Sequence, residues 1–466
     1  MSAAAATVEA GSFRDPGGRI FRAGEAILRT VTAAAAADFA RVNEAGVLRR
    51  LADNGQLVDF ADVTDQAAEY GLDAASFVLS HPRIPFVSYP YEWSFSLHKA
   101  AALAHLDLHL SLLQDGFTLS DATAYNVQFD GVRPVFIDHL SIRPYQDGEI
   151  WAGHRQFCMQ FLNPLLMWSM LDLQPSHWFR GSLEGIAPED LAKLIPWRKR
   201  LNLTVMTHVI AQAALQNRTV RTAGQAGRYR AARLPRKGFE GMLEGLRAHI
   251  ARLEVPSHRT VWGDYADNTS YSTPEMEAKH RFVREMVAAV KPDLLYDIGC
   301  NSGDYSIAAL DAGAGYVIGF DFDHGALEIA YRRAQEGNRK FLPLWLDAAN
   351  PSPSQGWSQA ERQGFSGRAA PQALLALAVI HHIAIGRNVP LDMATDWLVS
   401  HAPTGVIEFP HKTDPMVQTL LAHRSDIFPD YDKEAFARLL GKRARIVKQI
   451  DVLPTRTLFW FDRSQT

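Results

Sequence analysis

The sequence contains little cysteine, no excess of charge of one sign and no long apolar run. Two cysteines, Cys158 and Cys300, exclude a disulfide framework and a four-cysteine zinc site. Lys and Arg number 48 against 51 Asp and Glu, so no basic excess indicates nucleic acid or a membrane surface as a partner. The apolar run 373–380 is far too short to span a bilayer, and residues 1–18 lack the basic segment of a secretory signal. These absences predict a cytoplasmic protein without a membrane span.

The composition that remains is globular, with 47% hydrophobic residues in a chain of 466, enough for two or three domains. Seven basic residues and no acid lie between Gln216 and Phe239, and we interpret this stretch as a linker. Its charge is either simply solvated or contacts an anionic acceptor or partner. The predicted parts are a flexible lead-in (1–18), a mostly helical α+β domain (19–215), a basic linker with a connecting helix (216–256) and a second domain (257–466).

Local patterns predict the elements of the first domain. Alternating residues over 19–31 indicate one or two short strands, and apolar spacing over 33–54 and 93–113 indicates two long helices. A short hairpin is expected around Asp130-Gly131. The linker is expected to end in a helix over 239–253.

Strands and helices alternate in the second domain, which is typical of a largely parallel, doubly wound α/β sheet. Ligands of such sheets bind at the carboxyl ends of the strands. The predicted strands are 294–298, 316–320, 341–346, 374–380 and 406–409, the helices are 305–312, 326–336 and 395–401, and 445–452 with 457–461 form a closing antiparallel pair.

The turn after the first of these strands reads Asp-Ile-Gly-Cys-Asn-Ser-Gly-Asp, from Asp297 to Asp304. Gly299 and Gly303 allow a tight turn and the close approach of a ligand. A dinucleotide site would read G-x-G-x-x-G, whereas here Asn301 stands between the two glycines. The two carboxylates would repel a diphosphate and favour a cationic ligand without phosphate, such as S-adenosylmethionine.

Two further acids end the next strands of the predicted sheet. Asp321 follows the second strand, where an acid is suited to the two hydroxyls of a ribose. Asp347 follows the third strand and is placed for an adenine amino group. Together with the turn, these acids predict an S-adenosylmethionine site.

The same residues resemble motifs of class I S-adenosylmethionine-dependent methyltransferases, over about residues 260–466. Within that family the chain is similar to the methyltransferases related to the nodulation protein NoeA, which implies methyl transfer from S-adenosylmethionine and an additional N-terminal region. The segments that carry this closer similarity are Trp262-x-x-Tyr265, Lys279, Asn350-Pro-Ser-Pro, Gly356-Trp357, Ile380-His-His382, Asn388-Val-Pro-Leu391 and Asp414-Pro-Met-Val417.

Residues after the fourth strand normally face the transferred methyl group, and here they are His381 and His382. A histidine has a pKa near neutrality and can act as general base for a hydroxyl. Glu408, near the end of the fifth strand, is a second candidate base expected to face the same cleft. The alternative is that the histidines only pack or hydrogen-bond. An extended segment would point the two histidines to opposite faces, so no metal site is predicted there.

Tyr265, Tyr271 and Lys279 precede the predicted sheet. A segment at this place often folds over the donor, and Lys279 is expected to meet a carboxylate. We therefore include Tyr271 and Lys279 among the candidate cofactor-binding residues. A surface helix with its hydrophobic staple is the simpler alternative.

Asp121, Asn126 and Asp138 of the first domain resemble the catalytic loop and the metal-binding aspartate of protein-kinase-like folds. In that resemblance Asp121 is the base, and Asn126 and Asp138 hold magnesium. The chain departs from the pattern because no lysine precedes Lys99 and no phosphate-covering G-x-G-x-x-G is present. We therefore predict a degenerate kinase-like domain with a possible vestigial site. An active phosphotransferase, or a helical domain with a chance Asp–Asn pair, remains the alternative.

The sequence thus predicts an S-adenosylmethionine-dependent methyltransferase that acts on a hydroxyl of a small-molecule or glycan-type acceptor. The motifs leave open N- or C-methylation in a natural-product pathway, a regulatory protein that binds the donor without turnover, and a phosphotransferase fused to a methyltransferase. No nucleic-acid partner is expected, and the oligomeric state does not follow from the sequence.

Overall fold

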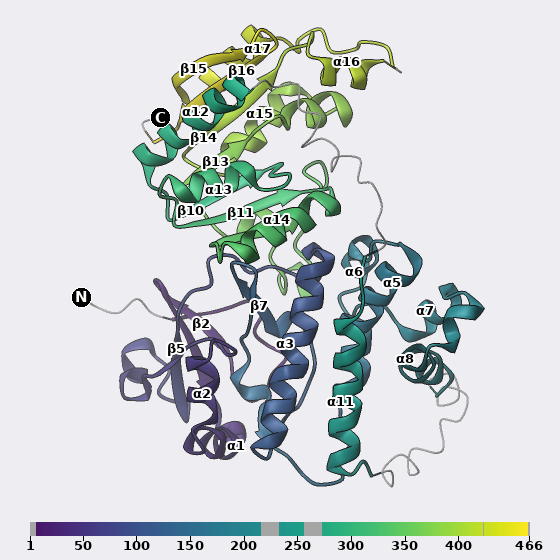
Figure 1. Cartoon of the computed structure of the whole chain (residues 1–466). Coiled ribbons are helices and arrows are strands. Elements are labelled where there is room, and N and C mark those ends of the chain that lie inside the picture. The colour runs from purple at the N-terminus through teal and green to yellow at the C-terminus, as the bar shows by residue number, and fades with distance from the viewer. Residues whose placement is uncertain (1–5, 216–232, 256–272, 423, 465–466) are drawn as a thin grey trace. The chain divides into compact units, whose positions relative to one another are not determined.

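The computed structural model of the chain describes residues 6–215, 233–255, 273–422 and 424–464. The chain forms two compact units: Met1–Ser257 with Ser354–Arg362, and His258–Pro353 with Gln363–Thr466 (Figure 1). The short segment Ser354–Arg362 therefore belongs to the first unit, although the chain on both sides of it builds the second. Nothing in the sequence predicted that this segment belongs to the first unit.

The first unit begins with an antiparallel sheet of five strands in the order β1-β2-β3-β5-β4. The alternation over 19–31 forms β2 and β3, as predicted. The strands are β1 (Thr7–Val8), β2 (Ile20–Ala23), β3 (Ala26–Val31), β4 (Ala61–Asp62) and β5 (Phe77–His81).

Helices, one two-stranded pair and one hairpin accompany this sheet. The predicted helix over 33–54 is two helices, because Gly46 adopts φ 71° and breaks the register between them. The elements are α1 (Ala33–Glu44), α2 (Val47–Asp53), α3 (Phe95–Gln114), the pair β6 (Phe117–Leu119) with β9 (Ile142–Pro144), and the hairpin β7 (Val127–Asp130) with β8 (Arg133–Phe136). The hairpin turns at Asp130-Gly131, as predicted.

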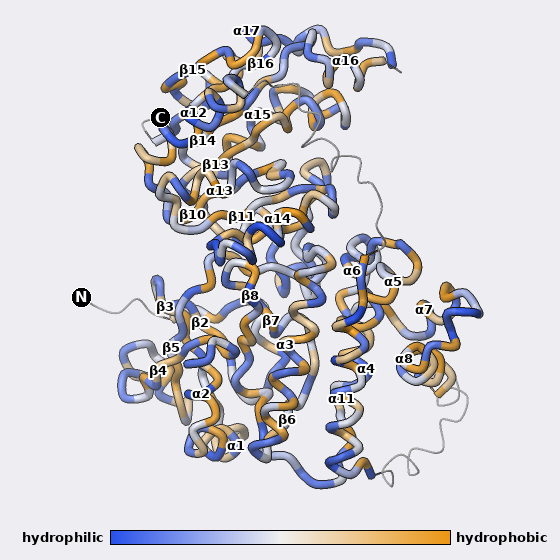
Figure 2. The backbone as a smooth tube through the Cα atoms, viewed as in Figure 1, coloured by the Kyte–Doolittle hydropathy of each residue, from blue (hydrophilic) through white to orange (hydrophobic). Residues whose placement is uncertain are grey.

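The remainder of the first unit is helical and contains two π-helical turns, η5 (Cys158–Leu162) and η7 (Met206–Ile210). The α-helices are α4 (His154–Phe157), α5 (Asn163–Leu171), α6 (Ser176–Gly181), α7 (Pro188–Leu194), α8 (Leu203–Val205) and α11 (Arg236–Ala251). Apolar and polar residues alternate along α11 (Figure 2), which buries Phe239, Leu243 and Leu246 on one face. Most of the predicted basic linker, residues 216–232, lies outside the described residues. Within the described ranges, no helix is long and apolar enough to cross a membrane.

The second unit is a seven-stranded sheet in the order β12-β11-β10-β13-β14-β16-β15. The first five strands in this order pair in parallel. The last two pairings, β14 with β16 and β16 with β15, are antiparallel. The strands are β10 (Leu294–Ile298), β11 (Tyr316–Asp321), β12 (Phe341–Trp345), β13 (Ala373–Ala376), β14 (Thr404–Pro410), β15 (Arg445–Leu453) and β16 (Arg456–Asp462). The doubly wound α/β sheet and its closing antiparallel pair are confirmed.

Every residue of β10, β12, β13 and β14 is buried, as expected where helices cover both faces of a parallel sheet. The edge strand β15, by contrast, alternates between exposed and half-buried residues. The helices are α12 (Thr273–Val290), α13 (Asp304–Asp311), α14 (His324–Glu336), α15 (Leu391–Ser400), α16 (Pro415–Leu421) and α17 (Lys433–Gly441), with a π-helical turn η11 (His382–Gly386).

The fourth parallel strand is shorter than predicted. The apolar run 374–380 was expected to be one strand, but β13 ends at Ala376. The chain then turns through Ala378 at φ 54°, while Leu377 and Ile380 stay buried. The prediction was wrong because the residues after Ala376 are buried but not extended. An apolar run alone does not distinguish a strand from a buried turn.

Candidate functional site

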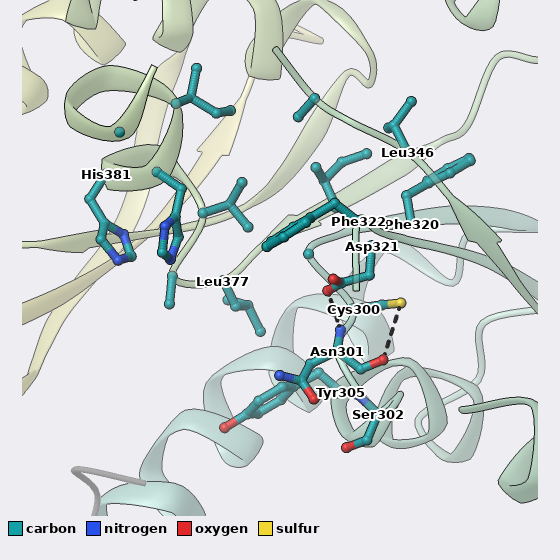
Figure 3. A pocket seen from close by; sticks show the side chains of 18 of the residues that line it. Cys300, Asn301, Ser302, Tyr305, Phe320, Asp321, Phe322, Leu346, Leu377 and His381 are labelled. Carbon is teal, nitrogen blue, oxygen red and sulfur yellow. Dashed lines mark hydrogen bonds between the residues drawn. The ribbon is translucent and has the colours of Figure 1, made fainter. Parts of the chain in front are cut away.

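A cavity of about 320 Å³ lies in the second unit, where the strands β10 to β13 end (Figure 3). Its volume is typical of a site for a small molecule, about 300–1,000 Å³. The chain runs outward from β10 through β11 to β12 and then returns to place β13 on the other side of β10. This reversal makes the switch point at which open α/β sheets bind ligands.

The turn after β10 forms one wall of the cavity. Gly299, Asn301 and Gly303 all have positive φ, at 76°, 49° and 84°. A Cβ at Gly299 would lie 2.2 Å from Cγ2 of Val379, and one at Gly303 would lie 2.5 Å from Phe341. Both glycines are therefore required by the turn and by packing within the protein. Gly299 and Asn301 line the cavity, whereas Gly303 does not.

Asp297 lies beneath this turn. Its side chain is buried, accepts a 2.7 Å hydrogen bond from the Ser306 hydroxyl, and does not line the cavity. Burial raises the pKa of the Asp297 carboxyl to about 7, against the lowering effect of the bond from Ser306. Asp297 thus fixes the start of α13 below the site.

Asp321 lies at the end of β11 and lines the cavity. Its two oxygens accept hydrogen bonds of 2.9 Å from the backbone N–H groups of Asn301 and Asp323. Burial raises the pKa of this carboxyl to about 6. The backbone N–H of Phe322 also lowers the pKa of this carboxyl through a hydrogen bond, and the lone pairs that remain can accept from a ligand.

The wall after β11 and β12 contains an apolar surface and a second acid. Phe322 lines the cavity and is 52% exposed. Asp347 also lines the cavity and pairs with Arg387 at 3.0 Å. The sequence analysis overlooked both Phe322 and Arg387. The signal for Phe322 was its place directly after Asp321.

His381 and His382 form the wall after β13, but the prediction of an extended segment is wrong. His381 has helical angles, φ −69° and ψ −30°, and η11 begins at His382. The rings therefore lie side by side, with centroids 4.0 Å apart. Burial lowers the pKa of His382 to about 4 and that of His381 well below its usual value. Both rings are neutral at physiological pH.

Glu408 was expected to face the cleft, but its carboxylate is fully buried and does not line the cavity. Glu408 Oε2 lies 2.6 Å from Lys279 Nζ, and Glu408 Oε1 lies 3.5 Å from Arg456. Arg456 also pairs with Asp414 through Nε at 2.6 Å. Lys279 and Arg456 line the cavity, so Glu408 holds two cations of the wall in place. Tyr265 and Tyr271 lie outside the described residues.

The three kinase-like residues come together in the first unit. The Asn126 amide donates to Asp121 at 3.3 Å and to Asp138 at 3.2 Å. Arg29 of β3 pairs with Asp138 at 2.9 Å. Burial, reinforced by the charge of Asp138, raises the pKa of Asp121 to about 7.

A further group in the first unit was not predicted at all. His154, Cys158 and His208 present their nitrogen and sulfur atoms to one another. The His-x-x-x-Cys spacing was visible in the sequence, but its partner 54 residues away from His154 was not.

Comparisons with solved structures give weak likenesses over less than half of the chain. The magnesium protoporphyrin IX methyltransferase ChlM of Synechocystis PCC 6803 is 18% identical, covers 44% of this chain and 94% of its own, and has a TM-score of 0.31. The N-methyltransferase NodS of Bradyrhizobium japonicum WM9 is 12% identical, with 41% and 97% covered and a TM-score of 0.31. The bifunctional kinase-methyltransferase WbdD is 14% identical, with 43% and 42% covered and a TM-score of 0.29.

No family model matches the chain. A full-length relative does: the nodulation protein NoeA of Rhizobium meliloti (strain 1021) is 49% identical over 460 residues, which cover 98% of this chain and 96% of the relative. Identity at this level over both units shows common descent of the whole architecture, and the chain belongs to the NoeA family.

Proposed function

We propose that the chain is an S-adenosylmethionine-dependent methyltransferase whose second unit binds the methyl donor. The observation that carries the proposal is the cavity at the switch point, with Asp321 at the end of β11. The carboxylate of Asp321 keeps lone pairs for the hydroxyls of a ribose. Phe322, beside it, offers an exposed aromatic face for the adenine.

The charges of the wall fit a ligand that carries a sulfonium and an ammonium. Three acids line the cavity: Asp304, Asp321 and Asp347. Asp304 and Asp347 each pair with an arginine, Arg333 and Arg387. Asp321 has backbone N–H partners instead, so its negative charge is not neutralised by a cation. Three cations, Lys279, Arg387 and Arg456, also line the cavity, so Asp321 is the acid whose charge is left for a cationic ligand.

Titration of the purified chain with S-adenosylmethionine tests donor binding. We expect Asp321→Ala to weaken binding at least about fivefold, because the ribose hydroxyls lose an acceptor whose absence costs about 1–3 kcal/mol. Asp311→Ala is the matched control, since Asp311 is a half-exposed acid of the same unit that pairs with Arg339. S-adenosylhomocysteine should bind and ATP should not. Equal affinities for the wild type and Asp321→Ala would refute the assignment of the ribose site.

We propose further that the acceptor is a small molecule or a glycan and that a hydroxyl is methylated. The donor supplies an electrophilic methyl group when bound. His382 would take the proton of the acceptor hydroxyl, and His381 would orient the hydroxyl. Burial keeps both imidazoles neutral, so His382 has a lone pair for the proton, but the same burial lowers its pKa to about 4 and makes it a weaker base than a free histidine. In the described part of the chain, neither nitrogen of His381 has a hydrogen-bond partner.

A panel of hydroxyl and amine acceptors with labelled donor tests the reaction. We expect methylation of hydroxyl acceptors, and we expect His382→Gln to lower kcat at least about 100-fold while donor binding is kept. Methylation of amines alone would contradict O-transfer. Donor binding without turnover on any acceptor would favour a regulatory protein.

We infer that residues 19–215 form a degenerate kinase-like domain that presents or recognises the acceptor, within a cytoplasmic protein. Asp138, which would hold magnesium in an active kinase, is neutralised by Arg29. We therefore expect no magnesium-dependent ATP binding by the full chain. ATP binding that Asp138→Ala abolishes would contradict this inference.

A further inference from the structure

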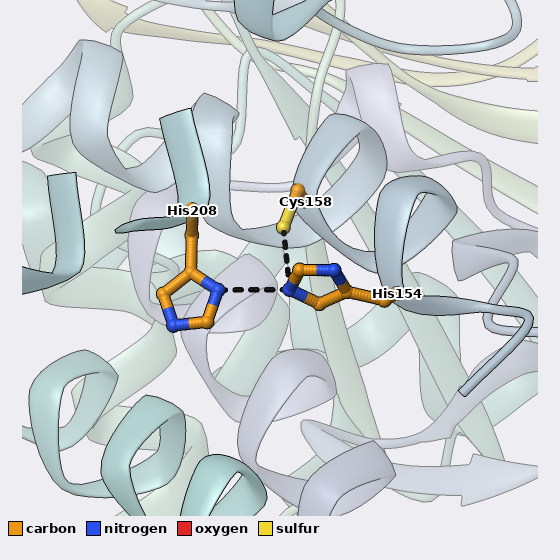
Figure 4. Close-up of side chains that lie close together, drawn as sticks. All are labelled: His154, Cys158 and His208. Carbon is orange, nitrogen blue, oxygen red and sulfur yellow. Dashed lines mark hydrogen bonds between the residues drawn. The ribbon is translucent and has the colours of Figure 1, made fainter. Parts of the chain in front are cut away.

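His154, Cys158 and His208 form a compact group of metal-ligand atoms inside the first unit (Figure 4). One ligand atom from each residue lies within 4.8 Å of the other two. The His154 and His208 nitrogens are 2.8 Å apart, and the Cys158 sulfur lies 3.7 Å from His154 Nε2. Cys158 is fully buried and His208 nearly so, while His154 is half-buried.

Two of the three separations can be compared with those of a tetrahedral zinc site. Bonds of about 2.0–2.1 Å to nitrogen and about 2.3 Å to sulfur place ligand atoms about 3.3–3.7 Å apart. The sulfur–nitrogen distance already has this value. The two nitrogens need to separate by about half an ångström, which small ring rotations supply.

The local backbone supports a functional role for the group. Cys158 begins the π-helical turn η5, four residues after His154 at the start of α4, so both side chains lie on one face. His208 lies within a second π-helical turn, η7. Such turns are rare and occur frequently at functional sites.

Gln212 supplies the outer contact that a metal-bound histidine requires. Its amide lies 2.9 Å from His154 Nδ1, and its oxygen has no hydrogen-bond partner among the described residues. Exchanging the amide oxygen and nitrogen positions is an assignment choice. In the exchanged orientation the oxygen accepts from Nδ1–H and His154 Nε2 keeps its lone pair toward the sulfur and His208, while the 3.5 Å bond that the amide nitrogen donates to the Cys158 sulfur is lost.

We propose that His154, Cys158 and His208 bind one zinc ion in the first unit. Cys158 loses one proton when the zinc–sulfur bond forms, and the two histidines bind as neutral ligands. The site then carries one net positive charge, which the half-exposed side of His154 leaves in contact with water, and water completes the tetrahedron. The ion would link α4 and η5 to η7, segments that are distant in sequence.

The test uses the full chain, stripped with a chelator and then titrated with zinc and with cobalt. We expect about one zinc per chain, a zinc-dependent rise of the melting temperature, and a thiolate-to-cobalt charge-transfer band. Since the sequence holds two cysteines, the band is assignable: Cys158→Ser should abolish it, and Cys300→Ser should keep it. Absence of zinc binding by the wild-type chain would overturn the proposal.

Variants of the two histidines give the matched comparison. We expect His154→Gln and His208→Gln to weaken zinc binding at least about tenfold, and His177→Gln, which changes an exposed histidine of the same unit, to leave it unchanged. Should Cys158→Ser fail to fold, the wild-type cobalt band and the histidine variants still decide the question. Zinc affinity unaltered in both histidine variants would refute the site.

Discussion

Two lysine–glutamate pairs in the second unit show how burial decides the role of a single charge. Lys279 and Glu408 pair at 2.6 Å with side chains 4% and 0% exposed, whereas Lys448 and Glu285 pair with side chains 40% and 48% exposed. Burial lowers the pKa of Lys279, and the charge of Glu408 opposes that effect. Lys279 of the buried pair lines the candidate donor site, whereas neither residue of the exposed pair does.

Lys279→Met therefore has a large expected cost and Lys448→Met a small one. Without Lys279, the buried charges that remain are Glu408, Arg456 and Asp414, with a net charge of −1. Removing one partner of a buried pair costs about 3–5 kcal/mol, whereas an exposed pair contributes about 0–1 kcal/mol. Scanning calorimetry of both variants measures the difference. Equal melting temperatures would contradict this account of the Lys279 contact.

The same residues show which contacts were predictable. Lys279 was expected to meet a carboxylate as a cofactor-binding residue, and the carboxylate that it contacts in the structure is that of Glu408, 129 residues later in the chain. Strand-end acids such as Asp321 were predictable because their position follows from one strand and its turn. A buried pair between α12 and β14 depends on how distant elements pack, and no local pattern encodes that.

At the scale of elements, the turns after β10 and β13 fit into each other. Gly299 at φ 76° leaves the space that Val379 fills, and Val379 is followed by Ile380 and the two histidines. The bounds of β10 and β11 were predicted to within one residue, because both are short apolar runs closed by polar turns. The end of β13 was not, because its turn is as apolar as the strand.

Gly299→Ala is expected to disturb the donor site through this fit. The new Cβ would clash with Val379, and a positive φ is unfavourable for alanine. We expect a loss of about 1–3 kcal/mol in stability and weaker S-adenosylmethionine binding. The double variant Gly299→Ala with Val379→Ala should restore part of the binding, because it removes the clash. Gly441→Ala, at the end of α17 with no neighbour within 4 Å, is the control. Binding that the double variant leaves no better than Gly299→Ala alone would disprove the coupling of the two turns.

At the scale of the whole molecule, buried neutral histidines dominate the predicted response to acid. Burial lowers the pKa of seven histidines to about 3 or 4, and that of three more well below the usual value. The first group is His81, His98, His105, His154, His208, His382 and His401, and the second is His109, His139 and His381.

Three carboxyls act in the opposite direction. Burial raises the pKa of Asp121 and Asp297 to about 7 and that of Asp321 to about 6. The folded state holds their protons more tightly than the unfolded state, so their contribution to stability falls as the pH rises from about 4 to about 7. For the histidines the unfolded state binds more protons, so their contribution is complete above about pH 6.5 and is lost as the pH falls toward about 4.

Each unit of pKa shift is worth about 1.4 kcal/mol of stability. The stability that ten imidazoles lose in acid therefore exceeds the stability that three carboxyls gain. We therefore expect a lower melting temperature at about pH 5 than at about pH 7.5. His105 gives the sharpest test, because neither of its nitrogens has a hydrogen-bond partner in the described ranges and its pKa falls to about 3. His105→Leu should reduce the difference between the two melting temperatures, whereas His177→Gln, at an exposed position, should not. If the chain melted at the same temperature at both pH values, burial of neutral histidines would not be what limits its stability in acid.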